Sequence, residues 1–203
     1  HFILCSAYSC APGAVKQTVY VRTGTYFLEA PLMLTPADSG LVLCAFPGES
    51  PVISGGRPIR GWRETRIADK LAWAADLPEV RDGKWYFREL WVNGERAQRA
   101  RHPNRGYLKI ADLPDKTASW TQGQRRFRFR EGDLTPSESL KDAELVVTTK
   151  WVESRLPVET VNEKERLVSC KKRAVFQAEA DDLYYLEGAQ AFLDEPGEWW
   201  LDR

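Results

Sequence analysis

Residues 48–56 read GESPVISGG, and this short stretch decides how the first part of the chain folds. A Val–Ile pair lies between a proline and two glycines, and similar apolar segments occur at 18–22 and 40–46. The residues between these segments favour turns, because glycine allows positive φ and proline restricts φ. Connections of about three to five residues that carry proline suit the corners of a solenoid, whose short strands stack in parallel about 4.8 Å apart. We therefore predict the first coils of a parallel β-helix.

The other short segments of this region are also expected to form strands. Residues 18–22 alternate between apolar and polar, which predicts a strand with one buried face. Residues 32–34 (LML) are expected to form a further strand. The continuous apolar run at 41–46 favours a strand buried on both faces, with Cys44 as a core thiol.

A different pattern begins near Trp62. Asn93-Gly94 is the strongest hairpin signal in the chain, because a type I′ turn needs positive φ at both central residues. The strands expected after it are longer, which is typical of an antiparallel sandwich or barrel. They lie at 125–131, 143–161, 165–170 and 174–180. A brief helix is expected near 186–192, and EWWLDR at 198–203 is expected to form a strand that pairs with nothing in the chain.

The composition excludes several classes of function. Lys plus Arg equals Asp plus Glu at 29 each, so bulk charge does not attract nucleic acid or an anionic membrane. No run of 18 apolar residues exists, which argues against a spanning helix. The apolar residues 1–10 resemble the end of a signal peptide but lack a basic leading segment, so export stays open. SGGR at 54–57 lacks the Lys-Ser/Thr continuation of a phosphate-binding loop, and no cofactor is expected.

The four cysteines are Cys5, Cys10, Cys44 and Cys170. They form no Cys-x-x-Cys pair and have no histidines at ligand spacing, so no metal site is expected. Cys5 and Cys10 could form a disulfide in an exported protein, and the sequence leaves this open.

Three segments together resemble the opening of a known family. They are VYVRTGTYFLEAPLMLTPADSGLVLCAFPGESPVISGG at 19–56, LWVNGERAQRARHPN at 90–104 and FLDEPGEWWLDR at 192–203. In this succession the chain resembles the N-terminal part of bacterial right-handed parallel β-helix proteins similar to glycoside hydrolase family 141. The resemblance implies a carbohydrate-active enzyme, with fucosidase and xylanase activities among the family's members, that is secreted, periplasmic or on the cell surface. It also implies that the catalytic carboxylates lie on coils beyond Arg203.

The pattern and the resemblance together predict an all-β chain with little helix, in three parts. Residues 1–70 would form the leading coils of the β-helix, 71–178 an inserted antiparallel sandwich or barrel, and 179–203 the segment that returns to the β-helix. The expected partners are an oligo- or polysaccharide, and either further coils of the same protein or a second copy joined through the C-terminal strand.

Glycoside hydrolysis needs two carboxyl groups, about 5 to 9.5 Å apart depending on the stereochemical outcome. The acidic residues near the C-terminus are typical of a solvated surface. A raised carboxyl pKa, as a catalytic acid needs, requires burial, which turn residues seldom have. Asp202 is the catalytic candidate among them, because it lies on the final strand. No catalytic pair is assigned within the chain.

Candidates for substrate binding are aromatic and basic residues. Sugar rings stack on indole, and the chain has eight tryptophans. Trp199 and Trp200 are candidates, and as neighbours on a strand they must point to opposite faces. Arg101 and His102 belong to a basic segment that either recognises uronic acids or sulfated sugars or forms a charged strand face.

Two interpretations of the whole chain stay open. In the first, it is the opening part of a β-helix glycoside hydrolase, non-catalytic by itself, which caps the β-helix and shapes the substrate groove. In the second, it is a carbohydrate-binding or adhesion module without catalytic function.

Overall fold

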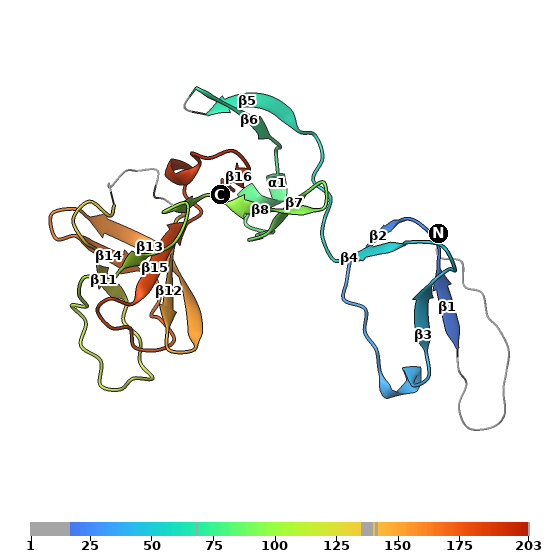
Figure 1. Cartoon of the computed structure of the whole chain (residues 1–203), viewed down its shortest axis with the longest axis horizontal. Coiled ribbons are helices and arrows are strands. Elements are labelled where there is room, and N and C mark those ends of the chain that lie inside the picture. Colours follow the sequence, from blue (N-terminus) through green and yellow to red (C-terminus); the bar gives the residue numbers. More distant parts are fainter. Residues whose placement is uncertain (1–16, 68, 135–139, 141, 203) are drawn as a thin grey trace. The chain divides into compact units, whose positions relative to one another are not determined.

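The computed structural model describes residues 17–67, 69–134, 140 and 142–202. Strands make up 38% of the chain and helices 6%, so the predicted all-β class is confirmed. The chain divides into two compact units, His1–Asp76 (unit 1) and Leu77–Arg203 (unit 2) (Figure 1). The disulfide considered between Cys5 and Cys10 lies outside the described residues.

Unit 1 contains two parallel strand pairs. They are β1 (Thr18–Val21) with β3 (Val42–Ala45), and β2 (Thr25–Phe27) with β4 (Val52–Ser54). Val19 is opposite Leu43, and Tyr26 is opposite Ile53. The chain thus lays β3 and β4 on β1 and β2 in the same order and direction, as successive coils of a solenoid do. The predicted parallel pairing is confirmed, whereas the complete β-helix remains a prediction. A single 3₁₀ turn, η1 (Pro36–Asp38), lies on the connection before β3.

Glu49 holds the corner that follows β1. Its carboxylate accepts hydrogen bonds from Arg22 Nε at 2.7 Å and from the Thr23 amide at 2.5 Å. These bonds hold the pKa of Glu49 at about 2, so the carboxylate is ionised at neutral pH. The Arg22 guanidinium also lies 4.4 Å from the centre of the Phe46 ring. Glu49, on the connection between β3 and β4, is therefore bonded to Arg22 and Thr23 on the connection between β1 and β2.

Two expectations for unit 1 are wrong. Residues 32–34 form no strand, and Met33 is 77% exposed. The segment at 41–46 contains β3, but it is not buried on both faces: Leu43 is 44% exposed and Cys44 is half-buried. The physical reason is that two stacked coils enclose too little space to cover both faces of a strand.

An antiparallel hairpin ends unit 1. β5 (Arg63–Ile67) pairs with β6 (Lys70–Ala74), and Arg63 Nη1 donates to Asp76 at 2.8 Å. The predicted boundary after residue 70 falls inside this hairpin. The division between the two units comes after Asp76 instead.

Unit 2 begins with helix α1 (Pro78–Arg81), whose first residue is a proline already restricted to helical φ. A small sheet follows, with strand order β16-β8-β7. Its strands are β7 (Leu90–Val92), β8 (Glu95–Arg99) and β16 (Glu198–Trp199). The predicted hairpin is confirmed, because β7 and β8 are antiparallel and the turn residues Asn93 and Gly94 have φ values of 52° and 85°.

The final strand, β16, runs parallel to β8, and Trp199 is opposite Arg99 in the register. The expectation that this strand pairs with nothing in the chain is therefore wrong. Its sequence has no local partner, since the paired strands are separated by the whole of the larger sheet. Pairing with β8 leaves at most one edge of β16 for association with a second copy.

The larger sheet of unit 2 has seven antiparallel strands (Figure 1). They are β9 (Arg101–His102), β10 (Leu108–Lys109), β11 (Arg126–Arg128), β12 (Glu144–Thr149), β13 (Val152–Asn162), β14 (Leu167–Cys170) and β15 (Leu183–Glu187). Hydrogen bonding follows the order β10-β15-β12-β13-β14-β11, with β9 also on β15. Strands do occur in the ranges expected at 125–131, 143–161 and 165–170, but the first contains only the three residues of β11 and the second contains two strands, β12 and β13, joined by a turn.

Two expectations for this part of the chain are wrong. Residues 174–180 form no strand, because their amides bond to Gln124 instead: Ala174 N donates to its carbonyl and Ala178 N to its side-chain oxygen, each at 2.9 Å. The helix expected at 186–192 is only the 3₁₀ turn η3 (Gln190–Phe192), since Leu186 belongs to β15. β15 lies between β10 and β12, although the predicted end of the inserted domain at residue 178 leaves it out.

One face of the larger sheet forms the main core. Alternate residues of β12 and β15 point into it and are almost fully buried: Leu145, Val147, Tyr184 and Leu186. Burial raises the pKa of Cys170, a free thiol in the same core, to about 12, so it is inert at neutral pH. The longest described helix has four residues, and none of the described helices could span a membrane.

Gly94→Ala is expected to destabilise unit 2 by about 1 kcal/mol, because an L side chain is strained at this positive φ while no atom lies near the added Cβ. Gly94→Asn should cost less, since asparagine tolerates the left-handed region. Urea unfolding measures both variants. Equal losses for alanine and asparagine would contradict a backbone origin of the effect.

Candidate functional site

Trp199 and Trp200 pack against different apolar clusters, and Trp200 lies just beyond the end of β16. Trp199 is 8% exposed, its ring stacks on Phe87 at 5.4 Å, and its Nε1 donates to the Ala97 carbonyl at 3.3 Å. Trp200 is half-buried against the main core of the larger sheet. Their burial supports a packing role and gives no support to sugar stacking by this pair.

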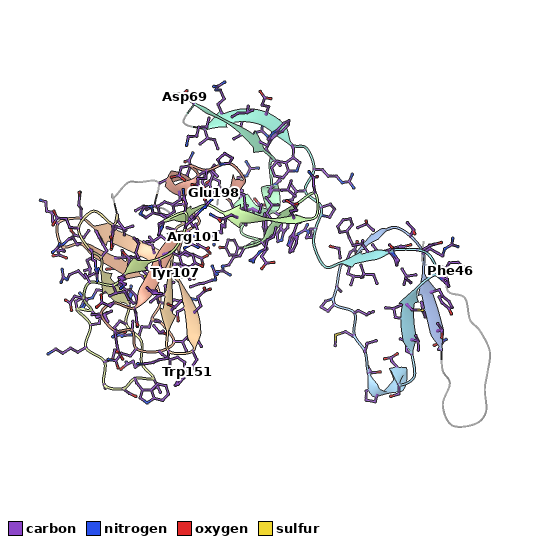
Figure 2. All side chains as sticks on the ribbon, viewed as in Figure 1. Phe46, Asp69, Arg101, Tyr107, Trp151 and Glu198 are labelled. Carbon is purple, nitrogen blue, oxygen red and sulfur yellow. The ribbon has the colours of Figure 1, made fainter. Side chains whose placement is uncertain are left out.

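Arg101 lies on β9 with its guanidinium over an aromatic ring. The distance to the Tyr185 ring centre is 3.9 Å, and Nη2 donates to the Gly106 carbonyl at 2.6 Å. Figure 2 shows Arg101 beside Tyr107, whose ring centre is 5.7 Å from the guanidinium. The ring contacts and the backbone acceptor fix Arg101 as part of the polar face of the sheet.

His102, the next residue, points to the opposite face. Its Nε2 lies 2.8 Å from the Asp133 carbonyl oxygen, and its ring stacks on Phe192 at 5.6 Å. The structure therefore does not bring Arg101 and His102 together on one binding surface. Asp202, the catalytic candidate, is exposed and has no described feature around it that favours proton transfer. Within the described ranges, no group of His, Cys, Asp or Glu side chains is arranged to hold a metal ion.

A buried ionic cluster joins the two sheets of unit 2. Arg99, on β8, is 7% exposed and donates through Nη1 to Glu144 at 2.6 Å and to Glu187 at 2.8 Å. Glu144 and Glu187 lie opposite each other on the neighbouring strands β12 and β15. Two carboxylates this close resemble the pair that glycoside hydrolysis requires, so their protonation and access decide what they do.

Glu144 is held as a buried anion. Arg88 donates to both of its oxygens, with Nη2–Oε1 at 2.6 Å and Nε–Oε2 at 3.1 Å, and the Tyr86 hydroxyl is 3.1 Å from Oε2. Burial opposes ionisation, but the hydrogen bonds from Arg88 and Arg99 outweigh it and hold the pKa of Glu144 at about 2. An ionised, 1% exposed carboxylate can neither donate a proton nor reach a sugar. The cluster is therefore structural.

Arg155 completes the cluster on the side of β13. It pairs with Glu187 and with Glu153, the latter at 2.7 Å, and its Nη2 lies 3.3 Å from the Tyr185 hydroxyl. Three strands of the larger sheet thus contribute to one charge network around Arg99. Because the centre of this network, Arg99 with Glu144 and Glu187, is buried, these ion pairs are screened less by salt than surface pairs are.

The same cluster requires a glycine at position 188. A Cβ at this position would lie 2.3 Å from Arg99 Nη2, and φ is 80°. Its amide donates to the Ala100 carbonyl at 2.9 Å, and the Ala100 amide donates to the Trp199 carbonyl at 2.8 Å. The backbone around Arg99 therefore connects the end of β15 to β16.

The aromatic surface of unit 2 consists of Trp120, Trp151 and Phe176. Trp151 is 77% exposed and Trp120 is 51% exposed. The Trp120 ring stacks on Phe176 with centres 5.3 Å apart, and the Trp151 ring lies edge-on to both, at 5.9 and 5.8 Å. Figure 2 shows Trp151 at the end of the larger sheet. Exposed, mutually packed rings of this kind offer flat apolar area to a ligand.

Backbone geometry positions these rings. Trp151 occupies the two-residue turn between β12 and β13, where Lys150 has a φ of 48°. Lys150 Nζ is tied to Glu179 at 2.6 Å, and the Gln177 amide donates to the Trp120 carbonyl at 2.9 Å. Because the backbone carrying the rings is already fixed, a ligand that binds them loses little affinity to ordering.

Sequence reasoning did not single out this surface. Trp120 and Phe176 lie outside strands, and no spacing relates them to Trp151. The one signal in the sequence was Trp151, which lies next to Lys150 between two segments of alternating polarity. Such a position is expected to be a hairpin turn, where packing does not require an indole.

Comparison of the chain with known protein families, with curated proteins and with solved structures gives no match.

Glu144→Gln is expected to lower the free energy of unfolding by about 3 kcal/mol at pH 7, because folding lowers the pKa of Glu144 from 4.5 to about 2. This stabilisation is present above about pH 4.5 and is lost as the pH falls through about 2. The variant should therefore lose less stability than the wild type across that range. Urea unfolding at several pH values measures this.

Glu131→Gln is the matched control, since the Glu131 side chain is 92% exposed. It should change stability by less than about 0.5 kcal/mol. An equally small effect of Glu144→Gln at pH 7 would refute the buried ionic cluster.

Gly188→Ala is expected to cost more than Gly94→Ala, because its Cβ meets Arg99 in addition to the backbone strain. We expect a loss of at least about 2 kcal/mol in the free energy of unfolding. Combining it with Arg99→Ala, which removes the clashing guanidinium, should give less than the sum of the two single losses. Simple additivity would show that Arg99 does not set the requirement for glycine.

Proposed function

We propose that this chain binds carbohydrate, as part of a carbohydrate-active parallel β-helix protein similar to glycoside hydrolase family 141. The observation that carries the proposal is the aromatic surface formed by Trp120, Trp151 and Phe176. Trp151 is 77% exposed and fixed at a hairpin turn, a position where an indole contributes little to folding. An oligo- or polysaccharide is the ligand class that this surface fits best.

The chemistry of pyranose rings supports this ligand class. A sugar ring has an apolar C–H face and a polar rim, so it packs on an indole or phenyl face while its hydroxyls stay in water or bond to neighbouring polar groups. Trp120 and Phe176 supply one stacked pair, and Trp151 supplies a second plane at 81° to Trp120. Lys150 and Glu179 provide polar groups beside the turn.

The strand pairing supports the β-helix part of the proposal. β1–β3 and β2–β4 are parallel pairs of short strands, and β8 and β16 form a third parallel pair. Between β8 and β16 the chain forms the seven-stranded antiparallel sheet. This is the order expected if an antiparallel domain is inserted into a parallel β-helix, as in the family that the chain resembles.

Hydrolysis is proposed for the β-helix protein as a whole, and no residue described here is assigned to it. The close carboxylate pair, Glu144 and Glu187, is buried around Arg99 and does not qualify. Because polysaccharides of this kind lie outside cells, we further propose a secreted, periplasmic or cell-surface location.

Trp151→Ala is expected to weaken glycan binding by about tenfold, or ~1.4 kcal/mol, because it removes one stacking plane. Affinity electrophoresis in gels containing xylan or a fucosylated glycan measures the retardation. Stability should change little, since the Trp151 side chain is largely exposed.

Trp91→Ala is the matched control, because Trp91 is 60% exposed but lies on β7, outside the aromatic surface. It should leave retardation unchanged. If the wild type is not retarded by any glycan, or if both variants lose binding equally, the proposed function is wrong.

A further inference from the structure

A small pocket in unit 2 is lined by charged and polar side chains. Its volume is about 220 Å³, and its lining residues are Asp115, Arg125, Arg126, Glu159, Ser169 and Arg173. Three guanidinium groups and two carboxylates give it a formal charge of +1. No apolar side chain lines it, so it suits a small polar group and not a hydrophobic ligand.

Two of the three arginines are already paired. Arg126 Nη2 lies 2.6 Å from Asp115, and Arg125 pairs with Glu159 and donates to the Cys170 carbonyl at 2.6 Å. Burial opposes ionisation of Asp115, but hydrogen bonds from Arg126 and the Arg125 amide outweigh it and lower its pKa. Both carboxylates are therefore occupied by fixed partners, and the pairing holds the pocket's walls in place.

Arg173 differs from the other two. In the described part of the chain its hydrogen bond goes to the Gly123 carbonyl, through Nη1 at 3.2 Å, and no acidic side chain pairs with it. The excess positive charge of the pocket thus resides on Arg173, whose guanidinium can offer further donors to an anion. A guanidinium suits carboxylate and sulfate oxygens, because its donors form a planar fork.

Two chain segments contribute to both the pocket and the aromatic surface: Trp120 and Arg125 lie on one, and Arg173 and Phe176 lie on the other. The Gln177 amide bonds to Trp120, the Ala174 amide to Gln124, and the Cys170 amide to Arg125, so residues 120–125 run alongside residues 170–177. Phe176 is three residues from Arg173, so their Cα atoms are at most about 11 Å apart. An oligosaccharide of a few rings can therefore reach from the aromatic surface to the pocket.

We propose that this pocket binds an anionic substituent, a carboxylate or a sulfate, of the glycan that stacks on Trp120 and Trp151, with Arg173 as its principal ligand. The inference rests on the proposed function and narrows the substrate to acidic glycans. Ser169, also in the lining, supplies a hydroxyl that can donate to the same anion. The pocket selects the charge, while the rings supply the larger contact area.

Calorimetric titration of the full chain tests this with three oligosaccharides that share one backbone. The first is a neutral xylo-oligosaccharide, the second carries a glucuronate group, and the third carries a sulfate. We expect the wild type to bind at least one acidic form about tenfold more tightly than the neutral form. The two acidic arms distinguish a carboxylate ligand from a sulfate ligand.

Arg173→Gln should remove this preference and leave binding of the neutral form unchanged. Arg166→Gln, which removes an exposed charge outside the pocket, should retain the preference. The proposal is supported if Trp151→Ala weakens binding of the neutral form while the wild type prefers an acidic form. The aromatic surface and the pocket then make separate contributions to binding. Equal affinity of the wild type for all three glycans, or an unchanged preference in Arg173→Gln, overturns the pocket proposal alone. Absence of binding to any glycan overturns the proposed function as well.

Discussion

One guanidinium, that of Arg99, sets the geometry of unit 2. It extends from β8 to Glu144 and Glu187 on two strands of the larger sheet, so three segments far apart in the sequence share one buried charge centre. Taking a charge out of water costs several kcal/mol, and close partners offset that cost, so a buried Arg99 requires β8 to lie against β12 and β15. The adjoining backbone conforms to this, because Gly188 leaves room for Arg99 and the Ala100 amide and carbonyl link β16 to the end of β15.

The ionic cluster around Arg99 stabilises the fold, and the side chains that could contact a ligand lie elsewhere. Glu144 is sealed from solvent and ionised, Glu187 is buried beside it on Arg99, and Trp199, on the parallel strand β16, is buried against Phe87. The groups that can meet a ligand lie elsewhere, on the segments 120–125 and 170–177 and on the turn at Trp151. Turns and loops suit this role, because a rigid sheet fixes their ends while their side chains stay accessible.

The sequence predicted best where a single residue type controls the backbone. Asn93 and Gly94 specify a tight hairpin, and the proline- and glycine-bearing corners around Val52 and Ile53 indicated parallel pairing of short strands. It failed where long-range partners decide. Glu144 alternates like any solvent-facing residue of an antiparallel strand, and only the approach of Arg88 and Arg99 makes it a buried anion. Likewise, the side chain and carbonyl of Gln124 take up the amides of residues 174 and 178, which otherwise have the composition of a strand.

The glycan proposed as ligand would contact Trp120 and Trp151, and not Trp199 and Trp200 near the C-terminus. Indole N–H resonances of a ¹⁵N-labelled chain, assigned by single Trp→Phe substitutions, test this directly during titration with an oligosaccharide. We expect progressive shifts of the Trp120 and Trp151 signals while those of Trp199 and Trp200 stay fixed. Shifts confined to Trp199 and Trp200, or no shift with any glycan, would contradict it.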